Sequence, residues 1–371
     1  MSAVGYRRLV VKIGSALITN GGRGLDRSGI ERWAAQVAEA HANGTEVVMV
    51  SSGAVAEGMA RMGWTERPES LDRLQAAAAI GQMGLTQAWG DAFGRHGLHT
   101  AQVLLTHDDV ANRRRYLNAR STLLSLLAVG AIPVINENDT VATDEIRFGD
   151  NDRLGAVAAQ LVEADGLIIL TDQPGLMTAD PRKDPTATLI ESGEAGDPAL
   201  RLHAAGGAGR LGRGGMLTKL DAAALAARSG AWTLLMDGRG PDALAQALTG
   251  TARGTRLSAK GAVLAARKRW IAGRLRVAGS VRLDRGAVQA LTCNGSSLLP
   301  VGVIAVSGEF RRGDLIACEA PDGRRIATGL SNYSAEEARQ IAGCASQELV
   351  DRLGYVGDVE LIHRDNLALE A

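Results

Sequence analysis

The chain has 371 residues, 46% of them hydrophobic, and a formal net charge of zero at neutral pH. This length exceeds the size at which a single core usually stops growing, so two domains are expected. Zero net charge argues against binding that depends on a broad cationic field over nucleic acid or anionic lipid. Three cysteines without a C-x-x-C pair favour neither a disulfide framework nor a zinc ribbon. No apolar run reaches the roughly 20 residues that span a bilayer, so we expect a soluble, cytoplasmic protein.

Short apolar runs alternate with segments of helical periodicity from the N-terminus to about residue 250. Strands are predicted at 8–13, 46–51, 101–106, 131–136, 166–171 and 231–237. Helices are predicted near 28–42, 53–62, 72–95, 109–128, 151–163, 216–228 and 241–248. Near-continuous apolar strands between helices indicate a mostly parallel sheet covered on both faces. Ligands of such sheets bind beyond the carboxyl ends of the strands, so the loops there are the candidate sites.

The pattern changes towards the C-terminus. Residues 277–355 form short apolar runs broken by Gly, Asn-Gly and Asp-Gly turns, which is typical of a small β-barrel or sandwich. We therefore predict a first domain at 1–255, a linker at 256–276, a mainly β domain at 277–355 and a C-terminal tail at 356–371. The second domain has eight arginines and nine acidic residues, so its composition offers no basic face to RNA.

The end of the first predicted strand carries Lys12, which is followed by Gly14. Only five of the 41 basic residues are lysines, so a lysine here suggests that a compact point charge is needed. Because a lysine in an apolar strand costs solvation unless it meets an anion, Lys12 is expected to face a phosphate in the carboxyl-end cleft. Gly14 would let the backbone approach a ligand closely. The alternative is a lysine that extends to water.

The second predicted strand leads through Ser51, Ser52 and Gly53 into a helix. Exposed N–H groups at a helix start favour an anion, such as a substrate carboxylate or phosphate. A plain serine N-cap is the competing interpretation, and the two are compatible.

The segment after the fourth predicted strand is strongly acidic. Residues 136–152 contain six carboxylates and one cation, Arg147. Such a cluster repels itself unless something cationic lies within it. Magnesium arriving with a nucleotide would account for some of the carboxylates, and an ammonium group on an acceptor molecule for others. An acidic surface turn without function is the alternative.

The most glycine-dense segment is LHAAGGAGRLGRGGMLTKLDAA. Its G-x-G-x-x-G match at 207–212 does not follow a predicted strand, which disfavours dinucleotide binding, and the sequence has no Walker motif. Arg210, Arg213 and Lys219 in an acid-free glycine loop before a helix predict a cradle for nucleotide phosphates. A surface loop without this role is the alternative. Thr171-Asp172, at another predicted strand end, lies where the base and ribose are expected.

Eight motifs, in this order, resemble those of the bacterial glutamate 5-kinase family: VVKIGSALIT, VSSGAVAEG, LNAR, PVINENDTVAT, FGDND, LTDQPGLMTADPR, GRGGMLTK and NGSSLLPVGV. The resemblance covers nearly the whole chain. It implies an α/β fold, with an amino-acid-kinase-like αβα sandwich followed by a small, mainly β PUA-type barrel. It also implies ATP-dependent phosphorylation of the L-glutamate γ-carboxylate to L-glutamyl 5-phosphate, the first step of proline biosynthesis, with feedback inhibition by proline.

The resemblance implies roles for individual residues. Lys12 and Lys219 would stabilise the transferring phosphoryl group, and Asp150 and Asp152 would order the lysines and Mg²⁺. L-glutamate would be bound by Ser52, Gly53, Asp139 and Asn151, with Asp139 taking the α-ammonium. ATP, the co-substrate, would be bound by Lys12, Gly14, Thr171, Asp172, Arg213, Gly214, Gly215, Met216, Leu217, Thr218 and Lys219. The resemblance further implies a homo-oligomer and a possible partner in the next pathway enzyme, glutamyl phosphate reductase.

The chain departs from the family pattern at three positions. Members often have Lys in place of Arg147, Thr in place of Arg213 and Ser in place of Leu217. These changes alter charge geometry and remove a hydroxyl, but they leave both lysines in place. An RNA-binding or regulatory protein on a degenerate kinase scaffold stays an alternative, as does another kinase of this fold. Carbamate, aspartate and nucleoside monophosphate kinases are disfavoured by the pairing of INEND with GDND.

Overall fold

The computed structural model describes residues 6–19, 21–142, 150–181, 183–205, 215–259, 277–355 and 358–370. The chain divides into two compact units, Met1–Val263 and Leu264–Ala371. Among the described helices, none is both long and apolar enough to cross a membrane.

The first unit is built on one eight-stranded sheet, in the order β3-β4-β2-β1-β5-β7-β8-β6. Its strands are β1 (Arg8–Ile13), β2 (Glu46–Val50), β3 (Thr100–Leu105), β4 (Ile132–Glu137), β5 (Gly166–Thr171), β6 (Ser192–Glu194), β7 (Trp232–Asp237) and β8 (Thr255–Ser258). Neighbouring strands from β3 to β7 run parallel, and β8 runs antiparallel to β7. The carboxyl ends of β1, β2, β4 and β5 therefore meet at one edge of the sheet.

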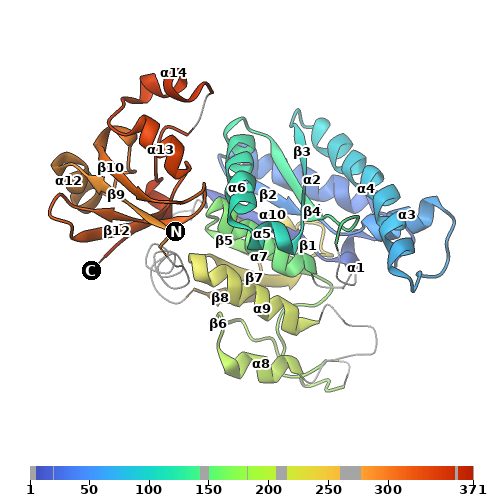
Figure 1. Cartoon of the computed structure of the whole chain (residues 1–371). Coiled ribbons are helices and arrows are strands. Elements are labelled where there is room, and N and C mark those ends of the chain that lie inside the picture. The colour runs from blue at the N-terminus through green and yellow to red at the C-terminus, as the bar shows by residue number, and fades with distance from the viewer. Residues whose placement is uncertain are drawn as a thin grey trace. The chain divides into compact units, whose positions relative to one another are not determined.

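Helices cover both faces of this sheet (Figure 1). They are α1 (Ser15–Ile18), α2 (Arg27–Ala42), α3 (Ala54–Arg61), α4 (Leu71–Gly94), α5 (His107–Ala111), α6 (Arg113–Ala128), α7 (Asp150–Val162), α8 (Pro198–Ala205), α9 (Met216–Ala226) and α10 (Ala243–Thr249). Buried side chains of α2, α4 and α10 share one core with the sheet, and those of α6, α7 and α9 share the other. The αβα arrangement expected from the alternating pattern is confirmed.

Each of the six strands predicted in this unit has a counterpart within one residue at either end. The pattern was clear because these strands are buried on both faces; all six residues of β5, for example, are buried. One predicted helix, at 109–128, is instead two helices, α5 and α6. The side chain of Asn112 caps α6 by accepting a hydrogen bond from the Arg115 backbone N–H, which starts a new helix at that point.

Two expected domain boundaries differ from the structure. Residues 256–258, assigned to the linker, belong to β8 (Thr255–Ser258) of the first sheet, where Leu257 is fully buried. The expected tail at 356–371 contains β13 (Leu367–Leu369), which pairs with β12 (Arg325–Leu330). Its apolar side chains belong to the second core, so the described part of this segment is integral to the second unit.

The second unit has a five-stranded sheet in the order β10-β9-β11-β12-β13. Its other strands are β9 (Gly279–Leu283), β10 (Val303–Gly308) and β11 (Leu315–Glu319), and the α-helices among its described residues are α12 (Arg285–Asn294), α13 (Ala335–Ile341) and α14 (Leu349–Leu353). The sheet was expected from the turn pattern, but the three helices were not. Asp284 and Ser334 cap α12 and α13 with their side chains, a start signal that the strand-and-turn interpretation overlooked.

Helices α3 and α4 cross with their backbones in close contact. A β-carbon placed at Gly58 would lie 1.8 Å from the backbone oxygen of Ala77, and one at Gly81 would lie 1.8 Å from that of Ala54. No side chain fits at either position, so glycine is required at both. This crossing fixes α3, and with it the loop between β2 and α3 that was predicted to bind a ligand.

Substitution of Gly81 by alanine is expected to lower the free energy of unfolding by about 1–3 kcal/mol or more, because the new methyl group overlaps a backbone carbonyl. Gly90 of the same helix is the matched control, since a β-carbon there meets nothing within 4 Å. Gly90→Ala is expected to raise stability by about 0.5–1 kcal/mol through helix propensity. Urea unfolding followed by circular dichroism measures both; equal effects of the two substitutions would contradict the close crossing.

Candidate active site

Two lysines from distant parts of the sequence share one carboxylate. Lys12 Nζ, from β1, lies 2.5 Å from Asp152 Oδ1, and Lys219 Nζ, from α9, lies 3.2 Å from Asp152 Oδ2. All three side chains are buried, with Asp152 fully so. We call Lys12, Asp152 and Lys219 the charged trio. Lys12 is thus buried against Asp152 at the carboxyl end of β1 and does not extend to water.

The position of Asp152 depends on how closely α7 approaches β1. Gly155, one turn further along α7, faces Lys12, where a β-carbon would lie 3.4 Å from Lys12 Cβ. Asp152 also accepts a hydrogen bond of 2.8 Å from the Thr218 hydroxyl, which links it to the first turn of α9. Strand β1 and helices α7 and α9 therefore converge on one carboxylate.

The electrostatics of the charged trio favour an anion. Burial alone would raise the pKa of the Asp152 carboxyl, but the charges of Lys12 and Lys219 and the hydrogen bonds that it accepts hold that pKa below the ordinary value. Burial lowers the pKa of Lys12, and the charge of Lys219 adds to this effect, while Asp152 opposes it. One carboxylate thus serves two buried ammonium groups, so the trio taken by itself carries a net positive charge. Such a charge attracts an anion, and a phosphate group is one that fits.

A second polar cluster lies beside the trio, because Asn151 precedes Asp152 on α7. Asn151 Nδ2 donates hydrogen bonds to Ser52 Oγ at 2.9 Å and to Asn136 Oδ1 at 3.1 Å. Gly53 follows Ser52 in the left-handed conformation, with φ of 108°, and a β-carbon there would lie 2.9 Å from Leu25 Cδ2. The structure therefore brings the predicted residues Ser52 and Asn151 together at the carboxyl end of β2.

Other predicted residues lie at the same edge of the sheet. The Gly14 N–H donates to the Leu170 backbone oxygen at 2.9 Å, so the close approach at Gly14 is to the end of β5. Thr171 donates to Asp172 Oδ1 at 3.1 Å. Gly215 precedes α9 as its N-cap, and the hydroxyl of Thr218 points to Asp152 and the Gly215 backbone oxygen. Met216 and Leu217 form the first turn of α9 and are partly buried.

Some predicted residues are not tested by these contacts. Arg147, Arg210, Arg213 and Gly214 lie outside the described residues, and Asp150 is described only as the start of α7. Asp139 is close enough to Arg67 to act on it: burial lowers the pKa of Arg67, and the Asp139 charge opposes that shift.

Sequence reasoning missed three contributors to this site, namely Asn136, Gln82 and Arg67. Asn136 lies inside the INEND motif, so the signal was present but was assigned to its acidic neighbours. Gln82, which accepts a hydrogen bond of 2.8 Å from Asn136 Nδ2, lies on α4 more than fifty residues away. A lone glutamine in a helical pattern carries no signal of its own. The same holds for Arg67 in the loop before α4.

Metal ligation has no candidate cluster in the described part of the chain, where no group of three or more His, Cys, Asp or Glu side chains is suitably arranged. Both oxygens of Asp152 already face lysines. Asp152 therefore fits a role in ordering the lysines better than one as a metal ligand.

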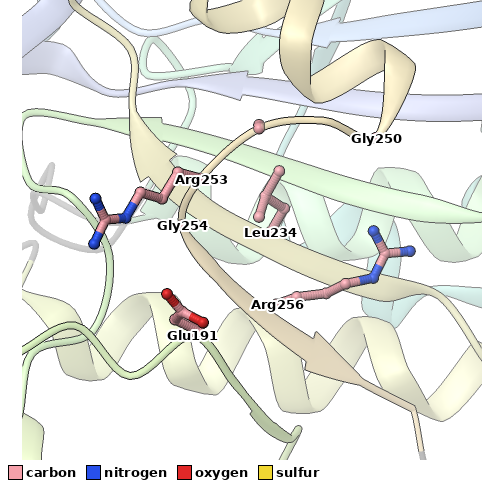
Figure 2. A pocket seen from close by; sticks show the side chains of 7 residues that line it. Glu191, Leu234, Gly250, Arg253, Gly254 and Arg256 are labelled. Atoms are coloured by element: carbon pink, nitrogen blue, oxygen red, sulfur yellow. The ribbon is translucent and has the colours of Figure 1, made fainter.

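A cavity of about 310 Å³, which none of the charged trio lines, lies beside β7 and β8. It is lined by Glu191, Leu234, Gly250, Ala252, Arg253, Gly254 and Arg256. Figure 2 shows the two guanidinium groups extending in opposite directions, with Glu191 between them. Arg256 stacks on Trp232, 4.1 Å from the ring centroid. None of the predicted site residues lines this cavity.

Comparison with known proteins identifies the family. The model of the amino acid kinase family matches residues 7–235, and that of the PUA domain matches residues 279–353. Glutamate 5-kinase of Burkholderia multivorans is 59% identical over 98% of this chain and 98% of its own length. The chain belongs to the glutamate 5-kinases of the amino acid kinase family. Glutamate 5-kinase of Chromohalobacter salexigens is 61% identical over 98% of this chain and 96% of its own length. The resemblance inferred from the motifs is thus confirmed, and so is the two-part fold of a kinase unit with a PUA domain.

The contribution of the charged trio to stability can be tested by removing its one negative charge. Asp152→Asn is expected to lower the free energy of unfolding by about 3–5 kcal/mol, because two buried ammonium groups lose their shared anion. The control is Asp221→Asn on α9, the helix that carries Lys219. This substitution breaks an exposed ion pair between Asp221 and Arg201 and should cost at most about 1 kcal/mol. Urea unfolding of both variants decides; an Asp152→Asn variant as stable as the control would show that the lysines are not held by this charge.

Proposed function

We propose that the protein transfers the γ-phosphoryl group of ATP to the γ-carboxylate of L-glutamate, giving L-glutamyl 5-phosphate and ADP. The observation that carries the proposal is the pairing of Asn151 and Asp152, consecutive residues of α7 that serve different neighbours. Asp152 holds the two lysines, and Asn151 contacts the Ser52 loop. The Cα atoms of adjacent residues are about 3.8 Å apart, so the two lysines and the Ser52 loop meet α7 side by side, which supports neighbouring phosphoryl and acceptor sites.

The proposed role of each residue follows from its charge. A γ-carboxylate oxygen attacks the γ-phosphorus while the bond to the ADP oxygen breaks, and both partners are anions that repel each other. The ammonium groups of Lys12 and Lys219 neutralise the transferring phosphoryl oxygens. Asp152 holds both lysines in place. Ser52, Gly53, Asp139 and Asn151 are proposed to bind the glutamate, and Asp139 provides the anion for its α-ammonium.

ATP is proposed to lie between the carboxyl end of β5 and the start of α9. Gly14, Thr171 and Asp172 would line one side, and Arg213, Gly214, Gly215, Met216, Leu217 and Thr218 the other. The start of α9 is favourable for phosphate because its first N–H groups are not used within the helix. Mg²⁺ would supply further neutralisation of the phosphate oxygens. Since Asp152 is occupied by the lysines, we propose that the ion enters with the nucleotide.

The proposal also includes a cytoplasmic location, a homo-oligomeric state and transfer of the labile acyl phosphate to glutamyl phosphate reductase. An RNA-binding protein on an inactive kinase scaffold is the rival. The intact charged trio supports catalysis, and the balance of eight arginines against nine acidic residues over 277–355 weighs against a broad RNA-binding face.

Hydroxylamine traps the proposed product, because it displaces phosphate from an acyl phosphate to give a hydroxamate. With MgATP, glutamate and hydroxylamine, the protein is expected to form γ-glutamyl hydroxamate. Lys219→Ala should lower kcat by about 10²–10³-fold, since one cation at the phosphoryl group is lost. Arg95→Ala, which removes a cation from an exposed ion pair with Glu31, is the control and should keep full activity. Protein that makes no hydroxamate yet retains structured RNA would favour the rival.

Proline is proposed to inhibit this reaction, as the family resemblance implies. Addition of L-proline to the hydroxamate assay should lower the initial rate at subsaturating glutamate. The preformed product, glutamyl phosphate, should react with hydroxylamine at an unchanged rate, which controls for interference with trapping. A rate that stays constant with proline in large excess over glutamate would contradict the inhibition and leave the kinase activity standing.

A further inference from the structure

Three side-chain amides form a chain of hydrogen bonds that runs from helix α4 to the proposed glutamate site. Gln82 accepts from Asn136 Nδ2 at 2.8 Å, and Asn136 Oδ1 accepts from Asn151 Nδ2 at 3.1 Å. We call Gln82, Asn136 and Asn151 the amide relay. Asn136 is 2% exposed, so water does not readily replace these bonds. We propose that Gln82 and Asn136 are positioning residues that fix which atom of Asn151 faces the amino acid. This inference rests on the proposed function and deepens it.

The orientation of the three amide groups is determined at α4, where the relay begins. The Thr86 hydroxyl donates its one hydrogen to the Gln82 backbone oxygen at 2.9 Å, so Thr86 Oγ1 serves as an acceptor for Gln82 Nε2 at 3.3 Å. The Gln82 amide nitrogen is thereby held towards Thr86, and its Oε1 is left to face Asn136. Asn136 must then present its nitrogen to Gln82 and its oxygen to Asn151. A backbone carbonyl of α4 thus orients three amides in series.

At Asn151, these orientations determine which hydrogen-bonding groups are left for a ligand. Both hydrogens of Asn151 Nδ2 are used, by Ser52 and Asn136, and Asn151 Oδ1 is a buried acceptor with no hydrogen-bond partner among the described residues. Ser52 Oγ accepts from Asn151, so its own hydrogen remains for donation. The pair therefore presents one acceptor and one donor. An α-amino acid matches it with its ammonium on Asn151 Oδ1 and its carboxylate on the Ser52 hydroxyl.

Helix α4 supports the same loop at a second point. Trp89 Nε1 donates to Ser51 Oγ at 3.0 Å, and the Ser51 hydroxyl donates to the Ser52 backbone oxygen at 3.2 Å. Gln82, Thr86 and Trp89 follow one another at spacings of four and three residues, which places them on one face of α4. One helix face thus supports both halves of the proposed amino-acid site, Asn151 through the amide relay and Ser52 through Ser51.

The test compares ligands with and without the α-ammonium. Gln82→Met keeps the length of the side chain but cannot hold Asn136 in one orientation. We expect the KM for glutamate to rise on the order of tenfold, while kcat and the KM for ATP change less than twofold. Inhibition by glutarate, which lacks the ammonium, should be unchanged. Gln87→Met, an exposed position on the same helix, is the matched control and should behave as wild type.

A conservative variant separates orientation from packing. Gln82→Glu keeps an oxygen towards Asn136 Nδ2, so its affinity for glutamate should lie closer to wild type than that of Gln82→Met. Thermal unfolding of each variant shows whether it is folded. An unchanged KM for glutamate in Gln82→Met would overturn the proposal. So would a parallel loss for glutamate, glutarate and ATP, which would indicate general damage instead of loss of ammonium recognition.

The experiments distinguish failure of the proposed kinase activity from failure of the proposed amide relay. Wild-type protein that forms no hydroxamate would remove the proposed kinase activity. Calorimetric titration of wild type and Gln82→Met with glutamate and glutarate still tests the amide relay in that case, because it needs binding and not turnover. Active wild-type protein whose preference for glutamate over glutarate is the same in Gln82→Met would leave the activity standing and reject the positioning role.

Discussion

The attraction of two buried ammonium groups to one buried carboxylate organises the kinase unit. Lys12, Asp152 and Lys219 come from a strand and two helices, and Asp152 is the point where these three elements meet. Taking charges out of water is expensive, and a single anion compensates two cations only in part. A phosphate group bound here, as proposed, would interact favourably with both ammonium groups.

Close backbone packing is what allows this edge of the sheet to be so crowded. Helix α7 packs against Lys12 at Gly155, and glycines at 58 and 81 let α3 and α4 cross in contact. Because α3 follows directly from the Ser52 loop, the crossing ties that loop to α4. The rigidity of the proposed amino-acid site therefore comes from helices that supply no charged group to the phosphoryl transfer.

Much of the fold and the centre of the site could be predicted, for identifiable physical reasons. Strands buried on both faces have unmistakable apolar runs, and the rarity of lysine in the chain marks Lys12 and Lys219 as candidate site residues. Strand β8 was missed because four residues with two buried side chains carry too short a pattern. The helices of the second unit were not predicted, because the glycine turns around them suggested short strands. Gln82 was missed because its role depends on a partner far away in the sequence, and only the folded chain reveals such a pair.

The proposed reaction brings together two anions, a carboxylate and a polyphosphate, and the arrangement on α7 addresses the resulting repulsion directly. Asp152 faces the lysines, whereas its neighbour Asn151 is uncharged and belongs to a relay of neutral amides. Apart from Asp139, the groups proposed to bind the amino acid are neutral, so they do not oppose the field of the two lysines at the point of transfer, as further carboxylates would. Recognition of the amino-acid head group by oriented dipoles is therefore compatible with an electropositive centre one residue away. A negatively charged residue in place of Asn136 would weaken that electropositive centre and would also lose the hydrogen bond that Asn136 Nδ2 donates to Gln82.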